Sequence, residues 1–228
     1  MNDERYSQKI AAKYLLNRNV SCVNKMIICL CVDASESMIQ DNRIGMVNQG
    51  IRNFIENCRK NSYSADCIDL CVITFGGNGA KIIQEFSSVR NMTFRDIKAH
   101  GNTPLASAVK LALDKIRKRV DQYAKSGITS YKPWLIIMSD GKCDILEKRE
   151  LSAVSKEVSD SVKKREFNVK CIDMGNGRET LQMFVPKDTI GTIDSMGITS
   201  FFELLSQSVV TVSSSVPGEF DDIDITAL

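Results

Sequence analysis

The sequence predicts an α/β protein built on a doubly wound, mainly parallel sheet, with helices on both faces and one antiparallel edge strand. Two observations favour this fold class. Short, continuous apolar runs alternate along the chain with segments whose apolar residues recur every three or four positions. The first pattern is typical of fully buried strands and the second of amphipathic helices. Strands that alternate with helices form a parallel sheet covered on both faces.

The first half of the chain predicts three strands and one helix. Residues 26–32 form a short β-rich run, and residues 67–75 form a second. The glycine-rich reversal 76–79 leads into residues 80–86, which predicts an antiparallel hairpin at a sheet edge. The helix lies between the first two runs. Its apolar stripe is Ile44, Val47, Ile51, Phe54, Ile55 and Cys58.

The second half predicts three more strands and three helices. The strands are expected at residues 134–138, 169–174 and 189–194, and a closing helix at residues 201–212. Pro104 suits the first turn of the helix that follows it. The apolar stripes of the other two helices are Leu105, Val109, Ala112, Ile116, Val120 and Tyr123, and then Leu151, Val154, Val158 and Val162. With strand order 3-2-1-4-5-6, the first and fourth strands are neighbours.

The chain divides into one domain and two terminal segments. We expect an N-terminal extension at residues 1–22, a folded domain at 23–212 and a mobile acidic tail at 213–228. The start is polar, which predicts no secretory signal, and no apolar run approaches membrane-spanning length. A formal charge of +2 is too small to indicate nucleic acid or a membrane as the main partner.

The eight cysteines favour a reducing compartment over a zinc or disulfide framework. No CxxC pair is present, and His100, the single histidine, cannot complete an ordinary zinc set. Four of the cysteines lie inside apolar runs, where a reduced thiol behaves as a small hydrophobe. They are Cys29, Cys31, Cys71 and Cys171. These features predict a cytoplasmic protein.

Three short segments place oxygen-bearing side chains where apolar runs end or helices begin. Asp33, Ser35 and Ser37 follow the first strand, Thr103 precedes a helix, and Asp140 follows the fourth strand. Two carboxylates and three hydroxyls form a ligand set for a hard divalent cation such as Mg²⁺. Because the carboxyl ends of neighbouring parallel strands meet at one edge, the topology brings these residues to one site.

Such a set leaves one coordination position for an outside ligand, for which the Asp or Glu of a protein partner is best suited. We also expect the positive end of the helix after Ser37 to add roughly 0.3–1 kcal/mol to anion binding. Taken singly, each segment has a simpler interpretation. The first is a helix cap, the Ser-Asp-Gly segment is a turn, and Thr103 with Pro104 is a helix start.

An alternative is a metal-dependent hydrolase or phosphatase that uses the same cation. His100, three residues before Thr103, is then the candidate base. Ser35 stands where a haloacid-dehalogenase-type phosphatase needs a second Asp, and no GxSxG elbow is present. A third possibility, nucleotide binding at the glycine-rich segment 76–79, is also disfavoured. The segment lacks both the GxxxxGK[ST] and the GxGxxG spacing, and it leads into a strand rather than a helix. These departures favour a binding module over an enzyme.

At these residues the chain resembles the von Willebrand factor A (VWA) domains, whose metal-ion-dependent adhesion site (MIDAS) has the pattern DxSxS…T…D. The resemblance covers residues 24–212. It implies a Rossmann-like sheet, a Mg²⁺ or Mn²⁺ ion and metal-bridged binding of a protein, with no catalysis. Carried over by position, the ligands are Asp33, Ser35, Ser37, Thr103 and Asp140.

A narrower likeness is to the TerY-type proteins of bacterial tellurium-resistance and stress-response systems. It is carried by residues 47–51, 72–75, 103–105, 131–134 and 139–141. It implies a bacterial cytoplasmic scaffold that works beside a protein kinase and a PP2C-type phosphatase. One departure is Glu36, which stands where many VWA domains have Gly between the serines. We expect its side chain to point to solvent.

Overall fold

A computed structural model describes residues 24–77, 79–141 and 147–213 of the chain. These residues form a six-stranded sheet in the order β3-β2-β1-β4-β5-β6. Neighbouring strands are parallel, except for the β2–β3 hairpin at one edge. The predicted fold class, strand order and antiparallel edge strand are confirmed. The strands are β1 Met26–Asp33, β2 Ile68–Gly76, β3 Gly79–Ser88, β4 Trp134–Ser139, β5 Asn168–Asp173 and β6 Gly191–Thr192.

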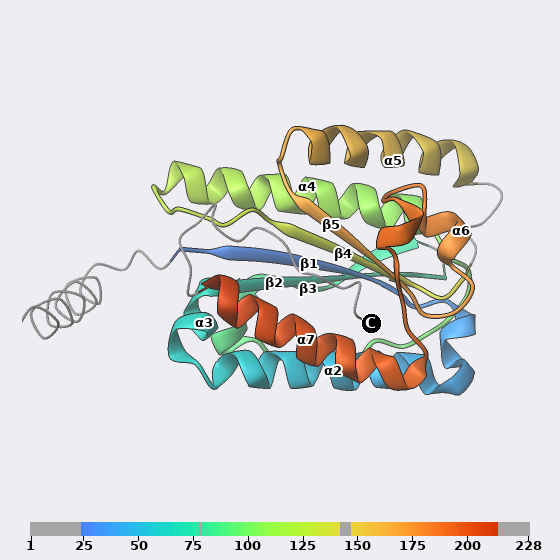
Figure 1. The fold of residues 1–228 in the computed structure, drawn as a ribbon, viewed down its shortest axis with the longest axis horizontal. Helices are drawn as coiled ribbons and strands as arrows, with labels where there is room; N and C mark the ends of the chain where they lie inside the picture. Colours follow the sequence, from blue (N-terminus) through green and yellow to red (C-terminus); the bar gives the residue numbers. More distant parts are fainter. Residues whose placement is uncertain (1–23, 78, 142–146, 214–228) are drawn as a thin grey trace, which may run out of the picture.

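Helices cover both faces of the sheet. Figure 1 shows α4 and α5 on one face, and α2, α3 and α7 on the other. The longer helices are α2 Arg43–Arg59, α4 Leu105–Lys125, α5 Lys148–Lys163 and α7 Ser195–Ser213. The shorter ones are η1 Glu36–Asn42, α3 Ser62–Cys67, η2 Val89–Asn91, α6 Arg178–Leu181 and η4 Lys187–Thr189, of which the η elements are 3₁₀ helices.

The central strand β1 supplies side chains to both hydrophobic layers. Its alternate residues Ile28 and Leu30 pack in the cluster that includes Phe54 of α2 and Phe202 of α7. Cys29 and Cys31, which alternate with them along the strand, pack in the other cluster, beneath α4 and α5. All eight residues of β1 are buried. Because both faces are covered, the strand reads as a continuous apolar run rather than an alternating one.

The cysteines behave as small core residues, as the sequence predicts. Within the described ranges, six cysteines are free and buried in the core. Cys29, Cys71 and Cys171 lie together in the cluster beneath α4 and α5. None of the described helices combines the length and apolar character that crossing a membrane requires.

Several elements differ from the sequence predictions in their ends. The sixth strand spans only Gly191–Thr192, because a 3₁₀ helix occupies Lys187–Thr189 and the last helix starts at Ser195. That helix, predicted at residues 201–212, runs from Ser195 to Ser213. The predicted N-terminal extension, residues 1–22, lies outside the described residues, and so does the predicted tail 213–228 from residue 214 on. Ser213, the first residue of that tail, is the last residue of α7 and is buried.

Candidate metal site

The two predicted acidic ligands follow neighbouring parallel strands. In the β1–β4 register Val32 stands opposite Met138, so Asp33 and Asp140 emerge at the same edge of the sheet. Both carboxylate residues are buried, with Asp33 0% and Asp140 3% exposed. The structure therefore brings the first and third sequence segments together, as the strand order predicts.

Asp33 is held only by neutral donors of the described residues. Its Oδ1 accepts a hydrogen bond of 2.8 Å from the backbone N–H of Ser35. Its Oδ2 accepts one of 2.6 Å from the hydroxyl of Ser139. Burial raises the pKa of Asp33 to about 6, against the lowering effect of these hydrogen bonds, and the charge of Asp140 raises it further. Among the described residues, the Asp33 carboxylate is thus buried with no cationic side chain bonded to it.

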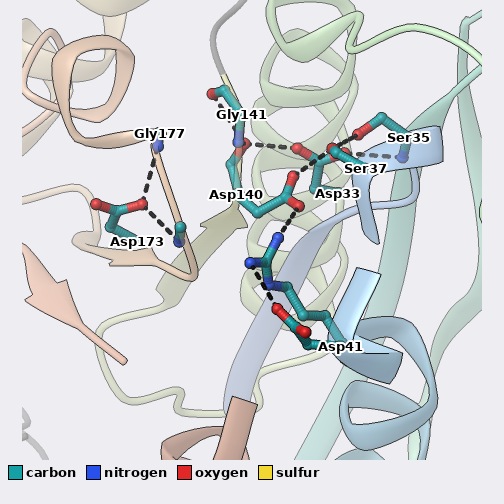
Figure 2. A network of polar contacts seen from close by, with 11 residues as sticks. Asp33, Ser35, Ser37, Asp41, Asp140, Gly141, Asp173 and Gly177 are labelled. Atoms are coloured by element: carbon teal, nitrogen blue, oxygen red, sulfur yellow. Dashed lines mark hydrogen bonds and ion pairs between the residues drawn. The ribbon is translucent and has the colours of Figure 1, made fainter. Parts of the chain in front are cut away.

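Two serines link Asp33 to Asp140. Ser35 Oγ and Ser37 Oγ are 3.0 Å apart, and Ser37 Oγ donates to Asp140 Oδ1 at 2.7 Å. Figure 2 shows the side chains of Asp33, Ser37 and Asp140 directed toward one another. The DxSxS segment therefore forms a compact group of oxygens rather than a simple helix cap. Glu36, between the serines, is exposed, as expected from the sequence.

Thr103 reaches the same place on a loop that crosses the strand ends. The loop is tied to β1 and its extension by two backbone hydrogen bonds, His100 N–H to Ala34 O at 2.7 Å and Glu36 N–H to Gly101 O at 3.0 Å. A carbon placed at the Cβ position of Gly141 would lie 3.8 Å from Ser37 Oγ and 3.9 Å from Thr103 Oγ1. All five predicted residues thus converge on one region.

The site also contains Arg43, which the sequence analysis did not single out. Its Nη1 donates to Asp140 Oδ2 at 2.8 Å, and its Nη2 lies 3.3 Å from Asp41 Oδ2. Arg43 begins α2 after two consecutive residues in the left-handed region, Asp41 at φ 51° and Asn42 at φ 55°. Asp and Asn are the non-glycine residues that adopt this conformation most readily, so the Asp-Asn pair was the available signal.

A third carboxylate, that of Asp173, organises the neighbouring loop after β5. Its Oδ1 accepts from Gly175 N–H at 3.0 Å and Gly177 N–H at 2.9 Å. Asn176 N–H in turn donates to Asp140 O at 2.8 Å. Figure 2 places Asp173 and Gly177 beside the segment that carries Asp140. Asp173 therefore positions the backbone around Asp140, and the Asp-x-Gly-x-Gly spacing at its turn was the sequence signal.

The expected helix end after Ser37 is not there. Ser37 lies within the 3₁₀ helix η1, and the α-helix begins at Arg43, beyond a kink. The prediction that this helix end adds to anion binding at Ser37 is therefore wrong, because the dipole effect falls off within the first turn of a helix. The donors near this segment are hydroxyls and the Arg43 guanidinium instead.

The oxygens present fit a hard divalent cation. Such ions take carboxylate and neutral oxygen ligands, and the site offers two carboxylates with hydroxyl groups close by. The buried Asp33 carboxylate lacks a charged partner among these contacts, which a cation would supply. Within the described ranges, the candidate site included, no group of three or more His, Cys, Asp or Glu side chains that could hold a metal occurs, so the proposed ligand set depends on its hydroxyls as well as its two carboxylates.

Comparison with solved structures places the fold among VWA domains. The von Willebrand factor domain of the type V pili tip protein Mfa5 from Porphyromonas gingivalis is 10% identical, with a TM-score of 0.61 over 88% of this chain and 99% of that one. The SpRpn10 VWA domain is 13% identical, with a TM-score of 0.54 over 80% and 95% of the two chains.

A pilus adhesin, SpaC from Lactobacillus rhamnosus GG, is 14% identical, with a TM-score of 0.63 over 83% of this chain. The present chain spans only 30% of that adhesin's length. No protein-family model and no curated protein matches the sequence. The likeness therefore shows the fold: a Rossmann-like sheet of the VWA type, with helices on both faces.

Proposed function

We propose that this protein is a binding module that captures a protein partner through a divalent cation, Mg²⁺ or Mn²⁺. The ligands in this proposal are Asp33, Ser35, Ser37, Thr103 and Asp140. The observation that carries it is the convergence of these side chains around Asp33, a carboxylate 0% exposed whose hydrogen bonds come from neutral donors. A buried carboxylate without a cation is costly, so a bound ion stabilises it.

The residues of the chain have separate tasks in this proposal. Asp33 and Asp140 supply negative charge, and the three hydroxyls supply neutral oxygens. Ser139 and the Ser35 N–H orient Asp33 by hydrogen bonds. A bound Mg²⁺ or Mn²⁺ supplies an electrophilic centre that takes an anionic oxygen from outside. An Asp or Glu of the partner is the ligand that suits this position.

The biological setting is a further part of the proposal. The motif resemblance to TerY-type proteins supports a bacterial cytoplasmic scaffold in tellurium resistance or another stress response. A protein kinase and a PP2C-type phosphatase are the partners that this resemblance implies. The VWA-type fold supports a protein-interaction role in general terms, since the pilus-tip and pilus-adhesin neighbours carry the same fold.

The hydrolase alternative has less support. It needs a base at the site, and His100 is the only histidine in the chain. The ring of His100 lies against the hairpin turn, since a Cβ on Gly77 would come within 2.7 Å of its Nε2. Its Nδ1 lies 3.2 Å from Lys98 O. Turnover of phosphoester substrates that depends on both Mg²⁺ and His100 would favour the enzyme instead.

Titration calorimetry with Mn²⁺ and Mg²⁺ tests the cation site. We expect the native chain to bind Mn²⁺, and Asp33→Ala to lose that binding while its circular dichroism spectrum is retained. Glu36→Gln is the matched control, because it removes an exposed carboxylate between the two serines. Equal binding by native and Asp33→Ala proteins would overturn the site.

A pull-down from the native cell tests the partner side. Proteins retained in Mg²⁺ should be released by EDTA and should not bind Asp33→Ala. Replacing individual Asp and Glu residues of the captured protein then identifies the outside ligand. Capture that survives both EDTA and Asp33→Ala would exclude metal-bridged binding.

A further inference from the structure

Arg43 forms an ion pair inside the candidate site. Its Nη1 lies 2.8 Å from Asp140 Oδ2, and the Arg43 side chain is only 17% exposed while that of Asp140 is 0% exposed. The other oxygen of Asp140 accepts from Ser37 at 2.7 Å. Both oxygens of this proposed ligand are therefore engaged by the chain itself.

The backbone before α2 holds Arg43 in this position. Asp41 and Asn42 adopt consecutive left-handed conformations, and this kink ends η1 and starts α2 at Arg43. A Cβ at Gly45 would collide with the Asn42 side chain, so glycine at this position leaves room for that side chain. Two consecutive non-glycine residues in the left-handed conformation are uncommon, and this conformation costs energy.

Asp41 offers the guanidinium a second carboxylate away from Asp140. Arg43 Nη2 lies 3.3 Å from Asp41 Oδ2, and the Asp41 side chain is 69% exposed. One arginine thus spans a buried carboxylate of the site and a solvent-exposed one at its rim. A shift of the guanidinium toward Asp41 frees Asp140 Oδ2 without leaving Arg43 unpaired.

We propose that Arg43 is a built-in competitor of the cation, which lowers the cation affinity of the free protein. This inference rests on the proposed function. Arg43 already neutralises Asp140, and a divalent ion beside it meets a like charge. A partner carboxylate adds negative charge between the Arg43 guanidinium and the divalent ion. The ion therefore binds tightly only when the acidic partner is present. Arg43 is thereby a specificity-determining residue for cation and partner together.

Calorimetric titration of the full chain with Mn²⁺ tests this proposal. We expect Arg43→Met to bind Mn²⁺ on the order of tenfold more tightly than the native chain, a typical coupling between two interacting sites. Arg43→Lys, which keeps the charge, should stay closer to the native affinity. Arg52→Met is the matched control, because Arg52 lies on the same helix and pairs with Asp96 at the surface. It should not change the affinity.

The outcomes separate this inference from the proposed function. Native protein that binds Mn²⁺ while Arg43→Met binds no more tightly overturns the competitor role and leaves the cation site intact. No Mn²⁺ uptake by the native chain or either Arg43 variant overturns both. If circular dichroism shows that Arg43→Met is unfolded, Arg43→Gln replaces it, since the amide retains N–H donors toward Asp140. The same increase in affinity is then required.

Discussion

Two buried aspartates on neighbouring strands have opposite electrostatic surroundings. Asp33, at the end of β1, is 0% exposed, and Asp69, near the start of β2, is 1% exposed. Asp69 is paired with Arg119, whose Nε lies 2.8 Å from its Oδ2, and with Lys25, whose Nζ lies 3.7 Å from its Oδ1. The hydroxyl of Tyr123 also donates to it. Among the described residues, the hydrogen bonds to Asp33 come from neutral groups, the hydroxyls of Ser139 and Ser35 and the backbone N–H of Ser35.

The difference distinguishes a structural carboxylate from a candidate functional one. Asp69 stands opposite Ile27 at the start of the strand pair, whereas Asp33 stands opposite Phe75 at its carboxyl end. At the first end the chain provides its own countercharge. At the second end the described contacts of the carboxylate are hydrogen bonds from neutral groups, and burial raises the pKa of Asp33 to about 6. A cation from outside would supply at Asp33 what Arg119 supplies at Asp69.

Removing Arg119 should have the largest effect on stability. Arg119→Met leaves Asp69 buried with only part of its countercharge, so we expect a loss of about 3 kcal/mol in the free energy of unfolding. Urea denaturation at neutral pH measures it. Arg117→Met is the control on the same helix, because its partner Glu157 is 43% exposed. That change should cost less than about 1 kcal/mol. Equal losses would show that Asp69 does not depend on Arg119.

Asp33→Asn should act in the opposite direction in metal-free protein. The amide avoids the cost of a buried charge, and each pKa unit corresponds to about 1.36 kcal/mol. A pKa raised from 3.8 to about 6 sets the gain. We therefore expect up to about 3 kcal/mol of added stability in EDTA at neutral pH, reduced by the weaker hydrogen bonds of the amide. The variant should also lose any stabilisation by Mn²⁺. Destabilisation in EDTA would contradict this account.

The cost of burying the Asp33 charge should also make the stability of the fold depend on pH. The unfolded chain releases the Asp33 proton near pH 3.8 and the folded chain near pH 6. Binding of that proton therefore stabilises the fold below pH 3.8, and this contribution is lost as pH rises through 6. Between these two pH values the free energy of unfolding of the native protein should fall by up to about 3 kcal/mol relative to that of Asp33→Asn. Above them the difference between the two proteins should stay constant. Urea titrations of both proteins in EDTA measure it. A flat difference would exclude the shift.

The sheet could be predicted from the sequence because burial on both faces leaves a plain signal. The runs at residues 26–32 and 134–138 are apolar throughout, and oxygen-bearing residues follow each one. Strand order then placed Asp33 beside Asp140, as the β1–β4 register confirms. The role of the five site residues as metal ligands stays a prediction.

The missed features depend on contacts between distant or short segments. Arg43 and Asp140 are 97 positions apart, and a charged residue at a helix start is ordinary without knowledge of its partner. The kink at Asp41 and Asn42 consists of two backbone conformations that most sequences avoid. The short helix Ser62–Cys67 has too few residues for a periodic pattern. Its cap, the Asn61 side chain on Tyr63 and Ser64 N–H, was the available signal.

Ser139→Ala sharpens the comparison with the smallest change in the site. Ser139 is 0% exposed and its hydroxyl donates to Asp33 Oδ2 at 2.6 Å, so its loss leaves Asp33 with fewer donors. We expect the free energy of unfolding to fall by about 1 kcal/mol. Mn²⁺ affinity should fall about tenfold, the usual effect of removing a residue that orients a metal ligand. Ser155→Ala is the control, because the buried hydroxyl of Ser155 donates to Ser152 O within α5. Unchanged Mn²⁺ affinity in Ser139→Ala, with binding lost in Asp33→Asn, would show that Ser139 does not orient the carboxylate.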